Sequence, residues 1–202
     1  MPYPSDHKQK TRQRIVEAAR VMFNRRGYDQ VSIDEIMAEA QLTRGGFYAH
    51  FRSKEELFAE ATISFLGGRG AQWRRKAGIN PAVREALNAR RMVDAYLSRE
   101  HLEDNDGQCP LIAYATDVAR AGPQVRQSYQ RLAEAMTGLF EMNLDGEEDE
   151  RRRRALSMTA LCVGGMILSR ALKDTHIGED IRAAAHQAAT DIWHDGAAVA
   201  AE

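Results

Sequence analysis

Helical periodicity is the feature of this sequence that most restricts its fold. Apolar side chains recur three and four positions apart along most of the chain, as in Ile15, Ala18, Ala19, Met22 and Phe23. This is the spacing of one face of a helix. Sustained two-residue alternation and Asn-Gly hairpin signals are nearly absent, so strands are not expected. The pattern therefore predicts an all-α protein.

Capping and breaking residues divide the N-terminal part of this pattern into helices. Gly27 ends the first helix, because glycine is common just past a helix C-terminus. Ser32 and Glu35 have the spacing of a capping box that starts a second helix. Thr43 is expected to cap a third helix, and Ser53 with the acids that follow it a fourth. The predicted helices lie at about 8–26, 33–40, 44–50 and 54–78, the last one loosened at residues 67–68.

The remainder of the chain is expected to form further helices. Asn80-Pro81 and Cys109-Pro110 are typical of helix starts, and Gly122-Pro123 ends one helix and begins the next. The polar stretch 101–108 predicts a loop. The last two helices are expected at about 156–172 and 181–193.

Residues 147–154 place four acids directly before four arginines. Each acid precedes an arginine by four positions, which is the favourable order for ion pairs on a helix surface. A basic targeting tract is the alternative interpretation. The matched acids favour the solvated start of a helix.

Charge and composition narrow the class of protein. Residues 1–54 contain ten Lys and Arg against six Asp and Glu, whereas the rest of the chain has a net charge of −5. A basic head before an acidic body fits a protein that presents one end to phosphates. No apolar run is long enough to cross a bilayer, and the two cysteines are too few for a disulfide framework. We therefore expect a cytoplasmic protein with no membrane partner.

Residues 32–51 are arranged as helix, short turn and helix. A turn at residues 41–43 has the length found in DNA-reading helix-turn-helix motifs, whose second helix enters the major groove. In this second helix, Arg44 is long enough to contact a guanine edge and Thr43 suits a phosphate oxygen. Gly45 and Gly46 are poor helix formers, so their presence suggests close approach of the backbone to DNA. A helical hairpin unrelated to DNA has the same spacing, and spacing alone leaves both interpretations open.

Several short motifs decide between these interpretations. These motifs lie in the stretch from residue 11 to residue 61. The longest is the run Phe47–Leu57 (FYAHFRSKEEL), and the others are Arg14–Ala19, Phe23, Gly27-Tyr28 and Val31–Ile36. This stretch resembles the DNA-binding head of the TetR family of bacterial transcriptional regulators. Beyond it, only the succession of helices and the chain length are similar to the family.

The resemblance implies a homodimer that binds double-stranded operator DNA, most often as a repressor that a small molecule releases. It implies a three-helix DNA-binding head over residues 1–54 and a ligand-binding and dimerising body over residues 55–202. Ser32 is implied near a phosphate, although its capping role explains it equally well. The candidate DNA-binding residues are Ser32, Thr43, Arg44, Gly45, Tyr48, His50 and Lys54.

Two groups of residues in the body are candidates for dimerisation and ligand binding. The expected dimer interface comprises Leu156, Ala160, Val163, Gly164, Ile167, Ala185, Ala188, Ile192 and Trp193. The expected effector pocket, between the fourth and eighth helices, comprises Phe65, Trp73, Met92, Tyr96, Tyr114, Met136 and Phe140. An ordinary intrachain core is the alternative for both groups.

Cys109 is a candidate sensor thiol, because a helix N-terminus favours the thiolate and the preceding polar loop suggests exposure. A structural cysteine is the alternative, and Cys162 is expected to be buried. We find no nucleophile elbow, phosphate loop or metal-binding spacing, so the sequence predicts no enzyme, catalytic residue, cofactor or metal. An architectural DNA-binding protein without an effector is the other alternative, and an apolar cavity in the body would distinguish the two.

Overall fold

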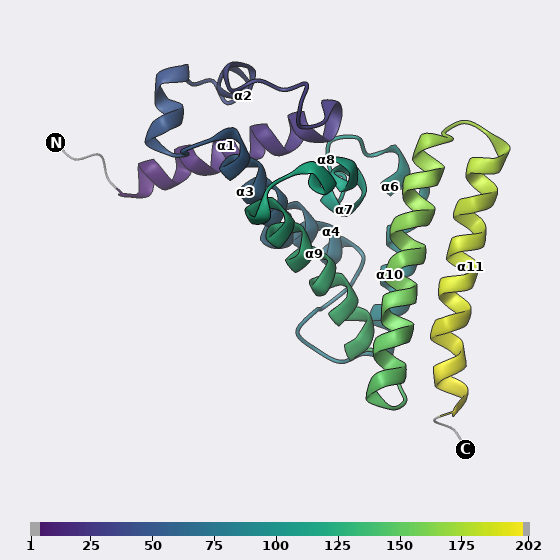
Figure 1. Ribbon diagram of the computed structural model, residues 1–202. Coiled ribbons are helices and arrows are strands. Elements are labelled where there is room, and N and C mark those ends of the chain that lie inside the picture. The colour runs from purple at the N-terminus through teal and green to yellow at the C-terminus, as the bar shows by residue number, and fades with distance from the viewer. Residues whose placement is uncertain (1–4, 200–202) are drawn as a thin grey trace. The chain divides into compact units, whose positions relative to one another are not determined.

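The computed structural model describes residues 5–199, and its described part contains helices and no strand (Figure 1). The chain folds into two compact units. The first comprises residues up to Gly68 together with Asn105–Leu132, and the second comprises Arg69–Asp104 together with the residues from Ala133 onward. The expected all-α class is confirmed. The functional boundary after residue 54 stays a prediction, since the first unit extends well beyond it.

The first unit is built around a hydrophobic core that its N-terminal helices share with a later segment of the chain. It contains α1 (Ser5–Arg26), α2 (Ile33–Glu39), the 3₁₀ helix η1 (Arg44–Ala49), α3 (Lys54–Gly67), α7 (Pro110–Ala113), α8 (Ala115–Arg120) and the beginning of α9 (Pro123–Met142). Phe23 packs edge-on against Phe58 at 5.0 Å between ring centroids, and Tyr114 lies 5.0 Å from Phe58. These rings join the N-terminal helices to the later segment 105–132 in one core.

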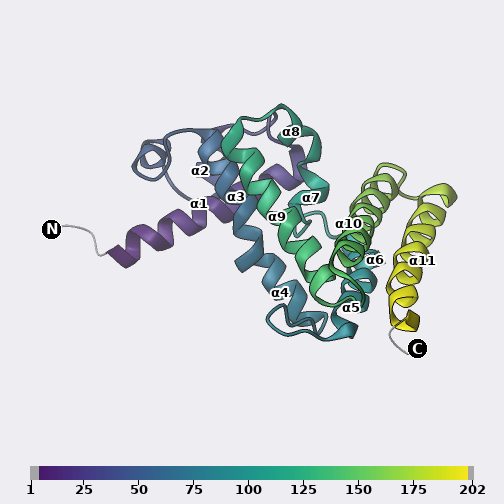
Figure 2. The same cartoon turned by 60° about the horizontal axis from the view of Figure 1, so that its bottom comes forward.

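The second unit contains the longest helices of the chain. It comprises α4 (Arg69–Lys76), α5 (Ala86–Tyr96), α6 (Arg99–Glu103), the end of α9, α10 (Glu148–Ala171) and α11 (His176–Val199). In Figures 1 and 2, α10 and α11 run side by side in opposite directions. Gly165 lets them approach closely, because a Cβ atom there would lie only 2.5 Å from the Cβ of Ala185.

The predicted helix ends of the N-terminal region are largely confirmed. Gly27 adopts a left-handed φ of +78° and its amide donates to the carbonyl of Phe23 at 2.9 Å, as in a glycine C-cap. The Ser32 hydroxyl accepts from the amide of Glu35, whose carboxylate accepts in return from the amide of Ser32. This reciprocal pair is the expected capping box. The helix expected at 54–78 breaks at Gly68 into α3 and α4.

The helix start expected at Asn80-Pro81 is wrong. The backbone of residues 80–85 is not helical and has a turn at residues 81–82, and α5 begins at Ala86. The buried amide of Asn88 donates to the carbonyls of Asn80 and Val83 at 3.0 and 3.2 Å. These two carbonyls would accept helical hydrogen bonds if the helix began earlier, so the buried Asn88 holds the segment out of the helix.

The loop expected at 101–108 is shorter than predicted. Ser98 caps α6, where its hydroxyl accepts from the amide of His101 at 3.1 Å. The buried His101 ring donates from Nδ1 to the carbonyl of Tyr96 at 2.7 Å. A polar residue therefore lies inside the fold, and the loop begins only at residue 104.

The arginines of residues 151–154 make different contacts from those expected. The acidic stretch does begin α10, as predicted. Arg152, however, pairs with Glu141 of α9 at 2.9 Å, and Arg154 donates to the carbonyl of Ile192 in α11 at 2.6 Å. Arg153 pairs with Glu150 at a spacing of three rather than four. Partners on other helices therefore replace the predicted pairs of Arg152 and Arg154, and Arg153 keeps a partner within α10 at a different spacing.

Candidate DNA-binding surface

The recognition segment, residues 43–50, is built on a buried aromatic base. Phe47 and Phe51 are 0% and 1% exposed, with ring centroids 5.7 Å apart. Tyr48, between them in the chain, is 63% exposed. Since Phe47 and Phe51 anchor the inner side of the segment, its remaining side chains are turned toward the outside.

A tight turn joins α2 to the recognition segment. Gln41 adopts a left-handed φ of +55°, and the amide of Leu42 donates to the carbonyl of Met37 at 2.8 Å. Arg14 of α1 donates to the carbonyl of Ala40 at 2.6 Å and so satisfies an acceptor at the end of α2. The turn lies at residues 41–43, where the sequence predicts it.

The recognition segment is a 3₁₀ helix rather than the expected α-helix. Thr43 precedes it in an extended conformation, but the Thr43 hydroxyl makes no capping hydrogen bond among the described residues. Gly45 and Gly46 weaken helix formation, and short 3₁₀ helices are common where α-helical bonding is not sustained. The structure gives no internal steric reason for Gly45, since a Cβ atom there would meet nothing within 4 Å. At Gly46 the nearest atom would be the Met37 methyl, at an ordinary 3.6 Å.

The candidate DNA-binding residues divide into an exposed and a half-buried group. Ser32, Thr43, Arg44, Gly45 and Tyr48 are exposed, whereas His50 and Lys54 are half-buried. The exposed group belongs to one helix-turn-helix, and the structure brings its members onto the same part of the first unit.

Arg44 has a partner within the protein. Its Nη1 donates to Oδ2 of Asp34 on α2 at 2.7 Å, and both side chains are more than half exposed. Such an exposed ion pair contributes little to stability. It leaves most of the guanidinium donors of Arg44 available to a ligand.

The two half-buried residues, His50 and Lys54, have lowered pKa values. Burial and the nearby charges of Lys8 and Arg12 lower the pKa of His50, so its ring is largely neutral at pH 7. Its Nδ1 is buried without a hydrogen-bond partner among the described residues. Burial also lowers the pKa of Lys54, whose Nζ lies 4.1 Å from the centre of the Tyr28 ring. A neutral His50 can offer a phosphate only a hydrogen bond and no charge.

Sequence reasoning missed the contribution of Arg12. This side chain lies over the ring of Phe51 and bonds the backbone at the end of the recognition segment. Its position was a usable signal, because residue 12 continues the inward stripe of Ile15, Ala19 and Phe23 at helical spacing. A charged residue on an otherwise apolar stripe indicates a specific partner.

The predicted effector-pocket residues lie in both units. Phe65 and Tyr114 belong to the first unit, and the Tyr114 hydroxyl donates to the carbonyl of Arg20 at 3.1 Å. In the second unit, the Trp73 and Tyr96 rings meet edge-on, and both lie against His101. The remaining three, all buried in the second unit, are Met92, Met136 and Phe140. The pocket itself stays a prediction.

Cys109 is the N-cap before Pro110, as predicted, but it is buried rather than exposed. The preceding loop is folded onto α1. Arg20 and Asn24 both donate to the carbonyl of Asp106, and Arg25 pairs with the Asp106 carboxylate at 2.6 and 2.7 Å. The hydrogen bond and charge of Arg25 lower the pKa of the Asp106 carboxyl. Cys162 is buried as expected, and burial raises the pKa of its thiol.

The predicted dimer residues lie on α10 and α11 with unequal exposure. Leu156 and Ala160 are exposed, Ala185 is buried, and the others are intermediate. A shallow apolar groove runs between the two helices, lined on the α10 side by Ala160, Gly164 and Leu168 and on the α11 side by Ile181 and Ala188. Ala185 packs against Gly165 within the chain, so it serves the helix pair itself.

Membrane-spanning helices and metal-binding clusters are considered for the described residues alone. None of their helices is both long enough and apolar enough to span a membrane. Residues 5–199 also hold no cluster of three or more His, Cys, Asp or Glu arranged to bind a metal ion.

Comparison with known proteins identifies the family to which the chain that carries this surface belongs. The model of the bacterial regulatory proteins of the tetR family matches residues 15–61, which include the recognition segment. The HTH-type transcriptional regulator AcrR of Shigella flexneri is 42% identical over 168 residues, which cover 78% of this chain and 77% of AcrR. The Transposon Tn10 TetC protein of Escherichia coli is 47% identical over 49 residues, so the chain spans only 25% of the length of that relative.

The fold agrees with these relatives. A TetR transcriptional regulator from Chloroflexus aurantiacus J-10-FL superposes with a TM-score of 0.71 at 23% sequence identity, over 92% of this chain and 96% of that protein. Sequence and fold lead to one assignment. The chain belongs to the TetR family of bacterial regulatory proteins, which are transcriptional regulators and not enzymes.

Proposed function

We propose that this chain is a repressor that binds a palindromic operator as a homodimer and is released by a small-molecule effector. The observation that carries the proposal is the exposed face of the recognition segment over its buried base of Phe47 and Phe51. Thr43, Arg44 and Tyr48 can then reach a duplex without any change in the core. Residues 1–54 would bind DNA, and residues 55–202 would bind the effector and the second subunit.

Each candidate residue has a distinct role in this proposal. Arg44 reads a base edge in the major groove, because its free guanidinium donors suit the paired acceptors of guanine. Thr43, Tyr48 and Lys54 contact phosphates, which position the segment without reading sequence. Gly45 lets the backbone approach the DNA closely, which is consistent with the open space around its Cα.

Two further residues, Ser32 and His50, would contact phosphates at the edge of the recognition segment. Ser32 would lie near a phosphate beside the start of α2, in addition to its capping role. His50 would offer a neutral N–H at most, since its pKa is lowered.

The groove between α10 and α11 supports the dimer part of the proposal. Leu156 and Leu168 are large apolar side chains that are about half exposed, and a second copy of the same face would cover them. The proposed interface residues are Leu156, Ala160, Val163, Gly164, Ile167, Ala185, Ala188, Ile192 and Trp193. A twofold dimer presents its recognition segments to successive major grooves, about 34–36 Å apart.

The names of relatives support repression. One relative, 30% identical over 80 residues, is a probable acrEF/envCD operon repressor of E. coli. The effector would bind among the aromatic side chains of the body, with Trp73, Tyr96 and Phe140 as proposed lining. An architectural DNA-binding protein without an effector is the competing candidate. A thiol sensor acting through Cys109 is disfavoured by the burial of that residue.

Selection of duplexes from a random pool by the purified protein tests the DNA-binding part. We expect an inverted repeat whose half-sites are about one helical turn apart, and footprinting on genomic DNA should protect the same sequence. Enrichment of no sequence, or of a site without twofold symmetry, would contradict the proposal. A panel of small molecules is then tested for release of the selected duplex. Release by none of them would favour the architectural alternative.

A further inference from the structure

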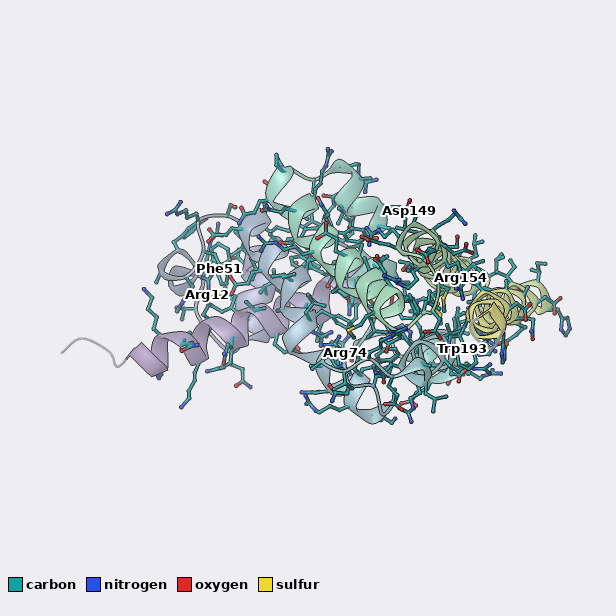
Figure 3. All side chains as sticks on the ribbon, turned by 90° about the horizontal axis from the view of Figure 1, so that it is seen from below. Arg12, Phe51, Arg74, Asp149, Arg154 and Trp193 are labelled. Atoms are coloured by element: carbon teal, nitrogen blue, oxygen red, sulfur yellow. The ribbon has the colours of Figure 1, made fainter. Side chains whose placement is uncertain are left out.

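The guanidinium of Arg12 contacts the C-terminal end of the recognition segment from inside the first unit. Its Cζ lies 4.0 Å from the centre of the Phe51 ring, and its Nη1 donates to the carbonyl of His50, the residue that ends η1. Figure 3 shows the labelled side chains of Arg12 and Phe51 next to each other. A single side chain therefore binds both the buried base of the segment and its terminal carbonyl.

Glu60 of α3 holds the other side of the same guanidinium. The Nε of Arg12 donates to Oε1 of Glu60 at 3.0 Å, and its Nη2 bonds to Oε2. Glu56 adds a more distant charge at 4.0 Å. Two parallel bonds to one carboxylate fix the plane of a guanidinium as well as its position. The Arg12 and Glu60 side chains are 31% and 34% exposed, so solvent screens this pair only in part.

The recognition segment depends on such external support. It is a six-residue 3₁₀ helix that contains two glycines and begins without a side-chain cap, and short 3₁₀ helices have poor hydrogen-bond geometry. The last carbonyls of any helix lack partners within the helix. Arg12 supplies a partner at that end and is itself held by the long helix α3.

We propose that Arg12 is a positioning residue for DNA recognition. It fixes the end of the recognition segment, and thereby the placement of Tyr48 and Arg44, while Glu60 fixes Arg12. It acts through the segment and makes no contact with a phosphate. This inference rests on the proposed DNA-binding function.

In the alternative explanation, Arg12 contacts a DNA phosphate directly, as one of several basic residues of the DNA-binding head. The two accounts predict opposite results for the substitution Glu60→Gln. If charge alone matters, removal of a carboxylate beside DNA strengthens binding. If Glu60 anchors Arg12, the same substitution weakens binding, because the two bonds to a carboxylate become a single hydrogen bond to a neutral amide oxygen.

The test compares Arg12→Lys, Glu60→Gln and the control Glu39→Gln, which removes an exposed carboxylate from α2. The probes are a duplex that the unmodified protein enriches from a random pool and a mixed-sequence duplex of equal length. Dissociation constants are measured by fluorescence anisotropy over a series of salt concentrations. Arg12→Lys and Glu60→Gln should weaken binding to the enriched duplex at least tenfold and to the mixed duplex less than threefold. The salt dependence should be unchanged, and Glu39→Gln should bind at least as tightly as the unmodified protein.

Other outcomes overturn the inference. Tighter binding by Glu60→Gln would assign Arg12 to a phosphate. The same assignment would follow if Arg12→Lys kept full affinity while a further variant, Arg12→Ala, showed a weaker dependence of binding on salt. An equal loss on both duplexes would indicate general damage to the fold. Circular dichroism and thermal unfolding check folding, and Phe51→Leu serves as a second variant that removes the ring under Arg12 and keeps every charge. It should reproduce the selective loss.

Hydrogen exchange of the free protein gives a readout that is independent of DNA. Glu60→Gln should increase exchange in peptides that cover residues 44–51, whereas Glu39→Gln should leave them unchanged. Equal exchange in both variants would overturn the inference. If the unmodified protein enriches no duplex, the proposed function fails, and the exchange experiment still decides whether Arg12 holds the segment.

Discussion

At the scale of single residues, Arg44 and Tyr48 have different environments and different expected roles. Arg44 is oriented by an exposed ion pair with Asp34, whereas Tyr48 projects from the segment with its ring edge-on to Phe47 at 5.2 Å. An oriented guanidinium suits base reading, because bidentate contacts demand a defined plane. A phenol hydroxyl at the end of a rigid ring suits a phosphate.

Substitution of these two residues should therefore have distinguishable effects. Arg44→Ala is expected to relax preference at particular base pairs, at about 1–3 kcal/mol each, whereas Tyr48→Phe should weaken binding to all sequences alike. Repeating the duplex selection with each variant measures both effects. Lys54→Gln is a comparison that should resemble Tyr48→Phe and also flatten the salt dependence. If all three variants lost affinity equally on every sequence, Arg44 would have no role in base reading.

At the scale of helices, the N-cap residues Ser32 and Thr43 differ in one hydrogen bond. The Ser32 hydroxyl accepts from the amide of Glu35 at 3.2 Å, and Ser32 also lowers the pKa of Glu35 to about 2. The Thr43 hydroxyl makes no such bond. Ser32→Ala should reduce the free energy of unfolding by about 1 kcal/mol, and Thr43→Ala should leave it nearly unchanged. Urea unfolding of the two variants checks this; equal losses would show that the capping hydrogen bond of Ser32 adds no stability beyond what Thr43 contributes without one.

The adjacent glycines of α10 also differ in their surroundings. A Cβ atom at Gly165 would collide with Ala185 of α11, whereas at Gly164 it would meet nothing within 4 Å. Gly165→Ala should therefore destabilise the protein by about 1–3 kcal/mol through overpacking. Gly164→Ala should be neutral or stabilising within the chain, because alanine favours helices. Thermal unfolding at one protein concentration compares them, and a silent Gly165→Ala would mean that the helices can separate without cost.

Helix ends were predictable where the determining contacts are local. Ser32 and Glu35 are three positions apart, so their capping box is visible in the sequence. Asn80 has an equally good capping sequence, but a buried amide eight residues later takes its carbonyl. Arg154 likewise bonds the carbonyl of Ile192, 38 positions away. Such long-range partners override local patterns, and nothing in the neighbouring residues indicates them.

At the scale of the whole molecule, the distinction between local and long-range contacts also decides which parts of the candidate site could be predicted. Thr43, Arg44 and Tyr48 come from one short segment, so a motif is enough to find them. The pair of Arg12 and Glu60 joins residues 48 positions apart; the place of Arg12 on an apolar stripe indicates that it has a partner, but the sequence does not show which residue that is. The inclusion of residues 105–132 in the first unit is equally invisible, because it depends on packing of Tyr114 against Phe58.

Dimerisation through α10 and α11 has a direct test. Leu168→Asp places a charge in the apolar groove, where Leu168 is 50% exposed, and should convert the dimer to monomer because a buried unpaired carboxylate is unfavourable. Val83→Asp is the matched control, since Val83 is similarly exposed at 45% but lies in the turn before α5. Sedimentation of both variants measures the oligomer. A dimeric Leu168→Asp protein would place the interface elsewhere.

The open space around Gly45 gives a lineage of such regulators a direct way to acquire new target promoters. A Cβ atom at this position would meet nothing within 4 Å among the described residues, so the packing of the chain leaves room for a small side chain there. Replacement by serine, arginine or aspartate can follow from a single nucleotide change in a glycine codon, and in the proposed DNA complex it would add a new group at the DNA surface. Divergence of regulatory circuits can therefore proceed at position 45 while the architecture that presents it stays unchanged.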